Sequence, residues 1–192
     1  YPFATIDPSV GVVAVPDPRL NRLSEMSKSE KTVPAAVEFV DIAGLVRGAA
    51  EGQGLGNKFL SHIREVDAIA EVVRMFDDED IVHVHDKVDP LHDIEVVNME
   101  LALADLETVH KRLERVERDA RSGDKDAILE KGALEHVLKE LENGKLAQNA
   151  PLTKEEHALL KGLHLLTMKP IIYVLNRKNG VVNVDAENGE RW

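Results

Sequence analysis

The chain contains no cysteine, and aromatic residues fill only 4% of its 192 positions. The lack of cysteine excludes disulfide frameworks and thiolate metal sites, and it fits a reducing compartment. The core must therefore be mainly aliphatic, and the apolar fraction of 43% is large enough to build one. No apolar run approaches the roughly 20 residues of a membrane-spanning helix, and no signal peptide opens the chain, so a cytoplasmic protein is expected.

Positive charge is also scarce, because 24 Lys and Arg residues face 35 Asp and Glu residues. The net charge of −11 argues against a general nucleic-acid binder, whose surface would be basic, although a local basic patch is compatible with it. The phosphate-binding pattern G-x-x-x-x-G-K-S/T occurs nowhere in the sequence. Any contribution to a nucleotide site must therefore be inferred from other motifs.

The most informative segment that is present comprises residues 37–65, VEFVDIAGLVRGAAEGQGLGNKFLSHIRE. A β-branched run ends at Asp41, and Gly44 follows three residues later in the pattern D-x-x-G. An Asp at the end of a strand can reach a metal-bound water, and a Gly lets its backbone N–H come close to a phosphate. The glycine-rich loop that follows can order and disorder, as a nucleotide-dependent switch requires. The segment predicts a nucleoside-triphosphate switch or hydrolase.

Strand and helix patterns alternate along much of the chain. Apolar and β-branched runs predict strands at residues 11–15, 36–40, 68–75 and 171–175, and the third of these unusually carries Glu71 and Arg74. Helical spacing predicts helices at residues 19–26 and 58–66. Alternating strands and helices favour an α/β fold with a mostly parallel sheet.

Between the last two strands the pattern changes to long helices. Apolar residues in the range 91–121 step by three and four, at Leu106, Val109, Leu113, Val116 and Ala120. A turn at residues 122–124 leads into a second amphipathic helix at residues 127–141. Two such helices joined by a tight turn predict an antiparallel hairpin of the coiled-coil type. A further helix, at about residues 151–166, is expected to return the chain to the sheet.

Several long blocks of the sequence resemble, in order and spacing, the YchF/Obg-like ATPase family, whose members are P-loop proteins related to translation factors and to the Obg GTPases. The blocks are TIDPSVGVV, VDIAGLVRGAAEGQGLGNKFLSHIRE, FDDEDIVHV, VDPLHDIEVVNMELALADL and LLTMKPIIYVLN. The resemblance extends to about Asn176 and implies a P-loop NTPase-type fold with an inserted helical hairpin. It divides the chain into a nucleotide-binding part at residues 1–89, the hairpin at residues 90–166, and a return to the nucleotide-binding part at residues 167–192.

By the same resemblance, the chain starts just after the family's Walker A loop and ends before its C-terminal TGS domain. The Walker A loop carries the Lys that neutralises β- and γ-phosphate charge. Residues 1–192 alone are therefore expected to be catalytically inactive.

The resemblance also implies a Mg²⁺ site. Thr5 would be the switch-one threonine that binds the metal, and Asp41 would hold the metal through a water molecule. Gly44 would sense the γ-phosphate through its backbone N–H. Hydroxyl and carboxylate oxygens are ligands that Mg²⁺ accepts alongside phosphate oxygens and water. The alternatives are a Thr that satisfies a local turn and an Asp that caps the turn after its strand.

Leu45 stands where Ras-like GTPases carry the glutamine that orients the attacking water. Leucine cannot polarise water, so hydrolysis would be slow unless another group assists. The resemblance makes His83 the candidate substitute, with His85 next by proximity, because an imidazole can position or activate water near neutral pH. The alternative is an exposed loop histidine without a catalytic role.

The base-recognition element departs from both known patterns. GTPases carry Asn-Lys-x-Asp after the strand, and the family carries Asn-x-x-Glu, whereas this chain reads N-R-K-N from Asn176 to Asn179. Asn176 matches the base-binding asparagine, and Asn179 stands where the acid is expected. Similar letters, NVDAE at residues 183–187, are displaced from the strand. Without Asp at the fourth position guanine specificity lacks its usual cause, so ATP is favoured over GTP.

The expected function is Mg²⁺-dependent binding of ATP, or alternatively GTP, with slow hydrolysis coupled to a switch. The resemblance implies ribosome association through the hairpin and the TGS domain. Basic residues on the first hairpin helix could contact RNA, but they alternate with acidic residues, so a solvated, salt-bridged helix is the alternative. These basic residues are Lys111, Arg112, Arg115, Arg118 and Arg121. A second functional class is a non-catalytic regulatory module, in which nucleotide changes the conformation and the coiled-coil arm binds a partner.

Overall fold

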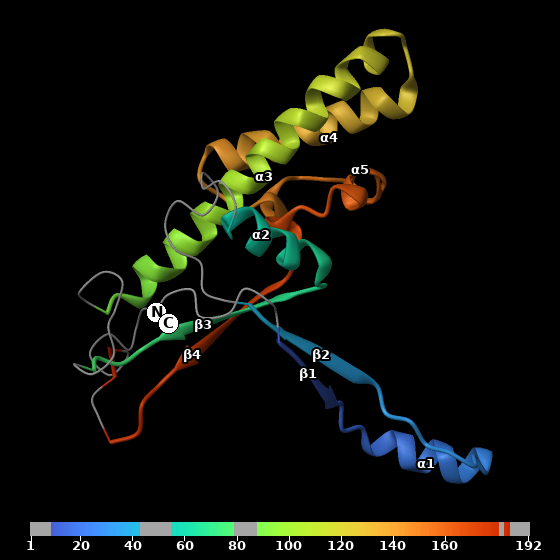
Figure 1. The fold of residues 1–192 in the computed structure, drawn as a ribbon. Coiled ribbons are helices and arrows are strands. Elements are labelled where there is room, and N and C mark those ends of the chain that lie inside the picture. Colours follow the sequence, from blue (N-terminus) through green and yellow to red (C-terminus); the bar gives the residue numbers. More distant parts are fainter. Residues whose placement is uncertain (1–8, 43–54, 79–87, 181–182, 185–192) are drawn as a thin grey trace. The chain divides into compact units, whose positions relative to one another are not determined.

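The computed structural model describes residues 9–42, 55–78, 88–180 and 183–184 (Figure 1). The chain divides into two compact units, one within residues 1–44 and the other within residues 45–192. In the described ranges each unit contains one two-stranded sheet. Among these residues, none of the helices combines the length and the apolar character that crossing a membrane would need.

The first unit is a pair of antiparallel strands with a helix at one end. Strand β1 (Ser9–Ala14) pairs with β2 (Ala36–Asp41), so that Ser9 lies opposite Asp41 and Ala14 opposite Ala36. Helix α1 (Pro18–Ser27) lies between them in the sequence. The chain leaves β1 and enters β2 at the same end, so this connection is a hairpin rather than a crossover. This pair therefore differs from the parallel arrangement expected for the sheet.

Both ends of α1 have local causes. The side chain of Asp17 accepts a hydrogen bond from the backbone N–H of Arg19 at 2.9 Å, and Pro18 occupies the first helical position, where no N–H donor is needed. The helix stops at Lys28, whose φ of 50° is left-handed.

The second unit contains the expected parallel pair. Strand β3 (Ile69–Arg74) pairs with β4 (Ile171–Asn176), and Ile69 lies opposite Ile171. Helix α2 (Leu55–Glu65) precedes β3 and buries Leu60 and Ile63. Parallel pairing requires a crossover connection, and the chain between β3 and β4, which includes the two long helices between residues 90 and 142, provides it (Figure 1).

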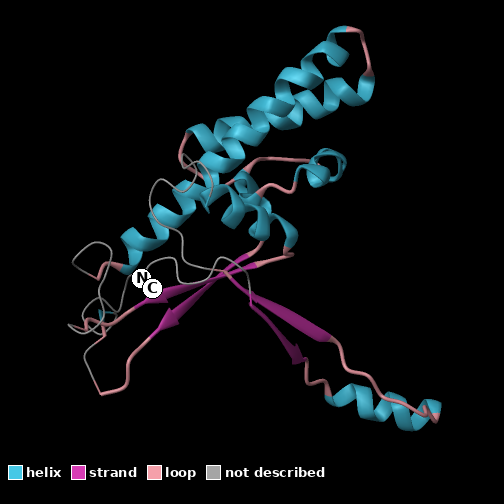
Figure 2. Cartoon of the chain, in the orientation of Figure 1, coloured by secondary structure: helices cyan, strands magenta, loops and turns pink. Residues whose placement is uncertain are grey.

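The predicted helical hairpin is confirmed. Helix α3 (Pro90–Arg121) packs antiparallel along α4 (Lys125–Glu142), as Figure 2 shows. Its core is the seam expected from the spacing, with Val109, Val116, Leu134 and Val137 buried. The remaining seam residues of α3 pack beside this core with partial exposure, namely Leu106, Leu113 and Ala120, and so does Leu138 of α4. The aliphatic core that the composition predicts is therefore located mainly in the hairpin.

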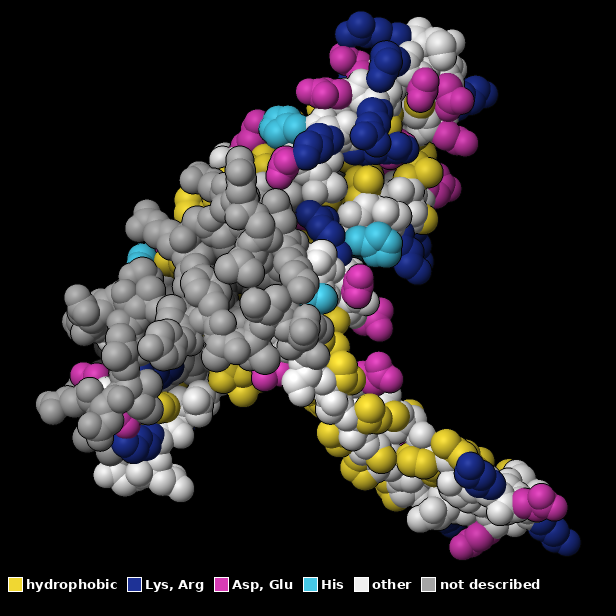
Figure 3. Space-filling model, in the orientation of Figure 1, with side chains coloured by type: hydrophobic (Ala, Val, Ile, Leu, Met, Phe, Trp, Pro, Cys, Tyr) yellow, Lys and Arg dark blue, Asp and Glu magenta, His cyan; other side chains and the backbone are white. Residues whose placement is uncertain are grey.

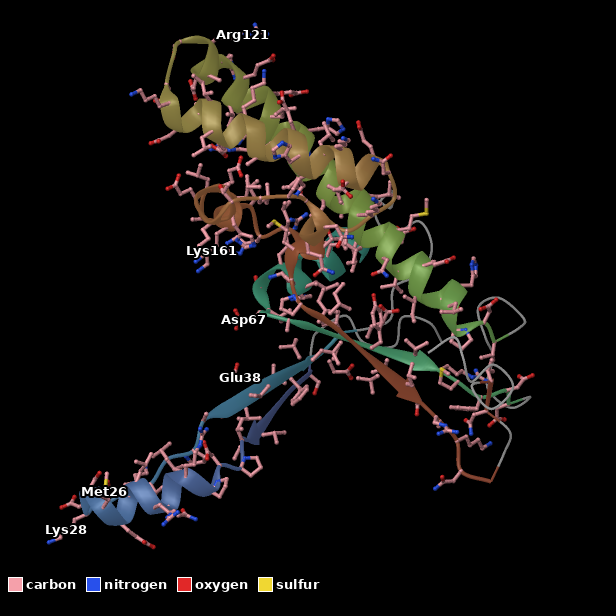
Figure 4. All side chains as sticks on the ribbon, turned by 180° about the vertical axis from the view of Figure 1, so that it is seen from behind. Met26, Lys28, Glu38, Asp67, Arg121 and Lys161 are labelled. Carbon is pink, nitrogen blue, oxygen red and sulfur yellow. The ribbon has the colours of Figure 1, made fainter. Side chains whose placement is uncertain are left out.

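The hairpin turn is built from residues 122–124. Gly123 has a φ of +88°, a conformation that residues with a Cβ rarely adopt. The side chain of Asp124 then accepts a hydrogen bond from the N–H of Ala127 at 2.9 Å and starts α4. Arg121, labelled in Figure 4, marks the end of α3 next to this turn.

The helix expected at about residues 151–166 is shorter than predicted. Helix α5 covers only Lys154–Leu160, after a capping box between Thr153 and Glu156. Beyond it the chain makes 3-10 turns at Lys161–Leu163 and Leu166–Met168, in addition to an earlier one at Ala147–Asn149. Gly162 weakens the helix, and His164 adopts a left-handed φ of 48°, which ends it.

A buried carboxylate joins this returning segment to the hairpin. Asp105 of α3 is fully buried and accepts hydrogen bonds from Leu166 N at 2.8 Å, Thr167 N at 2.7 Å and Thr167 Oγ1 at 2.7 Å. The Thr167 hydroxyl in turn accepts from Ala147 N at 3.0 Å. Burial raises the pKa of the Asp105 carboxyl, and the bonds from Thr167 and Leu166 oppose that shift.

A lysine makes a second connection next to the first. The ammonium of Lys169 donates to the carbonyl of Arg64 at 3.1 Å and to that of Val66, at the C-terminal end of α2. The guanidinium of Arg64 donates to Thr108 Oγ1 on α3 at 3.0 Å. The entry to β4 is therefore fixed against both α2 and α3.

Replacing Asp105 with Asn should destabilise the protein strongly. The amide keeps the shape of the carboxylate but turns an NH₂ group toward donors, so that at least one buried N–H loses its acceptor. We expect the free energy of unfolding to fall by about 2–3 kcal/mol. Urea denaturation of the complete gene product measures this change.

The matched control is Glu107→Gln, the same chemical change two residues away on α3. Glu107 is exposed and makes an ion pair with Lys111. Exposed pairs contribute little, so this variant should change stability by no more than about 0.5 kcal/mol. Equal losses in the two variants would contradict the assigned role of Asp105.

Candidate functional site

Two of the six residues predicted for the site lie in the described ranges, and they belong to different units. Asp41 is the last residue of β2 in the first unit, and Asn176 is the last residue of β4 in the second. The other four predicted site residues lie outside the described residues, namely Thr5, Gly44, Leu45 and His83. Their assignments stay predictions, and so does that of His85.

Asp41 has the chemistry expected of a metal-binding residue. Its side chain is exposed at the end of the strand and offers carboxylate oxygens, the ligand type that Mg²⁺ prefers. Within the described ranges, no group of three or more His, Cys, Asp or Glu side chains could hold a metal ion. A Mg²⁺ ion at Asp41 would therefore need phosphate, water and a hydroxyl such as that of Thr5 to complete its coordination.

Asn176 lies at the carboxyl end of a parallel strand pair. It is opposite Arg74 in the register, and its carbonyl accepts a hydrogen bond from Met75 N at 2.9 Å. Asn176 is exposed. Ligands of α/β proteins commonly bind beyond the carboxyl ends of parallel strands. The placement of Asn176 is therefore suitable for base recognition.

The loop after Asn176 is closed by the side chain of Asn183. Lys178 N donates to Asn183 Oδ1 at 3.0 Å, and Asn183 Nδ2 donates to the carbonyl of Lys178 at 3.2 Å. Asn183 is only 8% exposed, although Asn179 and its neighbours in the loop are exposed. The sequence placed Asn183 in a displaced copy of the base-recognition letters, but the structure shows it bonded to the loop backbone.

Residues after β3 support this loop. The segment containing Phe76 forms an antiparallel bridge with Asn183, and Val184 N donates to the carbonyl of Met75 at 2.8 Å. The side chain of Lys178 makes an ion pair with Asp78. The ends of β3 and β4 therefore continue into one hydrogen-bonded assembly.

Arg74 shapes the strand side of the assembly. Its guanidinium donates to the carbonyls of Phe76 at 2.8 Å and Asp78 at 3.3 Å, and it lies 4.9 Å from the centre of the Phe76 ring. The sequence signal for this feature was a mostly apolar strand that carries two charged residues, Glu71 and Arg74. The sequence did not indicate what Arg74 would bind.

The other unusual residue of β3, Glu71, lies in a partly buried site. Burial raises the pKa of the Glu71 carboxyl to about 7, and the nearby charge of Asp93 on α3 adds to the shift. Glu71 is opposite Tyr173 of β4, whose hydroxyl accepts from Asn98 Nδ2 at 3.1 Å. Among the described residues, Glu71 Oε2 and Asn98 Oδ1 are buried without a hydrogen-bond partner.

Comparison with known proteins identifies the family. A protein-family profile described as "50S ribosome-binding GTPase" matches residues 1–103, which is more than half of the chain. The chain belongs to this family. It is 57% identical over 176 residues to "Ribosome-binding ATPase YchF" of Bacillus subtilis, and that match covers 92% of this chain and 48% of the relative. The protein of the same name from Escherichia coli O157:H7 is 51% identical over the same shares.

A solved structure agrees with these matches. The Schizosaccharomyces pombe YchF GTPase is similar with a TM-score of 0.71 and 42% identity, over 93% of this chain and 49% of the other. The chain is therefore a YchF homologue, and the resemblance inferred from its motifs is confirmed, together with a mixed α/β fold that carries a long helical hairpin. It spans about half the length of the relatives it matches.

Several basic residues on the surface of the hairpin are paired with carboxylates. Figure 3 shows Lys and Arg side chains interspersed with Asp and Glu along the helical arm. Arg112 of α3 binds Glu130 of α4 through two hydrogen bonds of 2.6 and 2.7 Å. Lys111 and Arg121 also make ion pairs, with carboxylates four residues earlier on α3. Three of the five basic residues are therefore paired, which favours the salt-bridged alternative for them.

Replacing Glu71 with Gln should change how stability depends on pH. The pKa of Glu71 is raised from 4.5 to about 7, so the folded protein binds its proton more tightly than the unfolded chain. The free energy of unfolding that this group contributes therefore falls as pH rises through that window. In Glu71→Gln, the decrease in melting temperature between pH 5 and pH 8 should be smaller than in the parent protein.

Glu107→Gln again serves as the control. The hydrogen bond from Lys111 lowers the pKa of Glu107, so this carboxyl titrates at lower pH than that of Glu71. Its replacement should leave the pH 5 to pH 8 difference unchanged. A Glu71→Gln protein with the parent's pH dependence would refute the raised pKa.

Proposed function

We propose that this YchF homologue takes part in a Mg²⁺-dependent ATPase switch that hydrolyses the γ-phosphate slowly. The observation that carries the proposal is the position of Asn176, at the carboxyl end of β4 and followed by a supported loop. The fourth residue of this element is Asn179, so the carboxylate that reads guanine in GTPases is replaced by an amide. The names of the two bacterial relatives, both ribosome-binding ATPases, agree with this assignment.

The phosphate side of the site is proposed from the sequence. Asp41, through water, and Thr5 would hold Mg²⁺, and the backbone N–H of Gly44 would contact the γ-phosphate. A bound Mg²⁺ supplies positive charge that offsets the charge of the β- and γ-phosphate oxygens. The exposure of Asp41 at the end of β2 supports its part in this arrangement. We expect no turnover from residues 1–192 on their own, because no G-x-x-x-x-G-K-S/T motif occurs among them.

Water activation is assigned to a histidine. Leu45 offers no polar atom to the attacking water, and His83 is the proposed replacement for the glutamine of Ras-like proteins. An imidazole that only positions water, without a strong base, fits a slow reaction.

The partner is proposed to be the ribosome, reached in the cytoplasm through the helical hairpin. The names of the relatives support this, and the hairpin offers a long charged arm. We retain the division into nucleotide-binding parts at residues 1–89 and 167–192, with the arm at residues 90–166, as part of the proposal. A non-catalytic switch, in which the arm binds its partner without turnover, is the competing function, and Leu45 favours it.

Titration of the complete gene product with Mg-ATP and Mg-GTP tests the nucleotide. We expect ATP to bind at least about tenfold more tightly than GTP, because an amide cannot accept both N–H groups of the guanine edge. Isothermal titration calorimetry measures both affinities. A preference for GTP would overturn the proposal and direct attention to Asp185 as an acidic base reader.

His83→Ala, with His85→Ala as its neighbouring control, tests catalysis in the complete gene product. We expect His83→Ala to lower the rate of ATP hydrolysis at least about tenfold with unchanged ATP affinity, since general acid–base groups contribute at least that much. His85→Ala should retain the parent rate. Unchanged trace turnover in His83→Ala would support the non-catalytic switch instead.

A further inference from the structure

Asn183 is a buried polar residue whose bonds serve an exposed loop. Its carboxamide accepts from the N–H and donates to the C=O of a single residue, Lys178, at 3.0 and 3.2 Å. It therefore imitates a neighbouring strand and pairs with both backbone groups of Lys178. The bonds bridge five positions of the chain and fix the loop at the residue directly before Asn179.

The carboxamide is itself held in place by the end of β3. The Phe76–Asn183 bridge and the bond from Val184 N to the Met75 carbonyl fix the backbone on which Asn183 is carried. Arg74 in turn holds the carbonyls of Phe76 and Asp78. The side chain of Asn183 thus connects the end of β3 to the loop after β4.

Two contacts fix the chain directly before Asn179. Asn176 fixes the chain three residues before it, because its carbonyl is bonded to Met75 N at the end of the parallel pair. Asn183 fixes the residue immediately before Asn179, and Asn179 is itself exposed. An exposed amide that directly follows an anchored stretch of backbone is pre-organised to meet a ligand.

We propose that Asn183 is the positioning residue of the base-recognition loop, and that it presents the amide of Asn179 to the edge of an adenine. This inference rests on the proposed nucleotide-binding function. A carboxamide offers one acceptor and one donor side by side, which match the N6–H donor and N1 acceptor of adenine. The guanine edge offers two N–H donors there, and these require the two acceptors of a carboxylate.

The proposal distinguishes positioning from general stability. Residues 177–180 of the loop are exposed, so losing the carboxamide should open the loop locally while the hairpin core stays folded. Base recognition should then weaken, whereas binding of the phosphates should not. Inorganic tripolyphosphate carries the phosphates without the base and therefore separates the two effects.

The experiment uses Asn183→Ala in the complete gene product, titrated with Mg-ATP, Mg-GTP and Mg-tripolyphosphate. We expect ATP affinity to fall about tenfold, the ratio of ATP to GTP affinity to approach one, and tripolyphosphate affinity to stay at the parent value. Asn143→Ala is the matched control, because the amide of Asn143 also bonds a backbone carbonyl, that of Lys139 at 2.7 Å, but at the end of α4. This control should bind all three compounds like the parent.

Two further variants keep the test decisive if Asn183→Ala folds poorly. Asn183→Asp retains the acceptor for Lys178 N but turns an oxygen instead of a donor toward the Lys178 carbonyl, so it should also lower ATP affinity while tripolyphosphate affinity stays at the parent value. Asn179→Asp should raise the affinity for GTP relative to ATP when Asn183 is intact. The same change combined with Asn183→Asp should raise it less, since coupled residues give non-additive effects.

The outcomes separate the two proposals. Equal losses of ATP and tripolyphosphate affinity in the Asn183 variants would show a merely structural role and overturn this inference alone. Additive effects of the Asn179 and Asn183 changes would do the same. If the parent protein binds tripolyphosphate but shows no preference for ATP, both the proposed function and this inference fail.

Discussion

The placement of β4 depends on the buried carboxylate of Asp105. A charge removed from water is tolerated only when hydrogen bonds replace its hydration, and the backbone N–H groups of Leu166 and Thr167 provide this replacement. These partners lie 61 and 62 positions further along the chain. The carboxylate therefore determines where the chain returns from the helical arm to the sheet.

The position of Asn176 follows from that return point. Asp105 binds the 3-10 turn at Leu166–Met168, and Lys169 directly follows this turn. Lys169 joins the entry of β4 to the end of α2. From there β4 runs parallel to β3, and its last residue is Asn176. The position of Asn176, the proposed base-binding residue, thus follows from polar contacts at the base of the arm, and Lys178 in the loop after it is bonded to Asn183.

The polar residues of the second unit fall into two energetic classes. Asp105 and Asn183 are buried and well bonded, so they specify one arrangement of backbone segments. Glu71 is partly buried beside Asp93 with an oxygen that has no partner among the described residues, so its ionised form is disfavoured. The first class stabilises the fold, whereas burial and the charge of Asp93 raise the pKa of the second.

The sequence by itself determined the family, the helical hairpin with its seam, and the strands, because these depend on local periodicity and on long matching blocks. It also marked Glu71 and Arg74 as unusual and Asn176 as the residue that ends a strand. Only the tertiary structure decided the antiparallel pairing of β1 with β2, the early end of α5, and the bonds of Asp105 and Asn183. Those features depend on which backbone groups, far apart in the sequence, come into contact in the folded chain. The spacing of residues along the sequence does not predict such contacts.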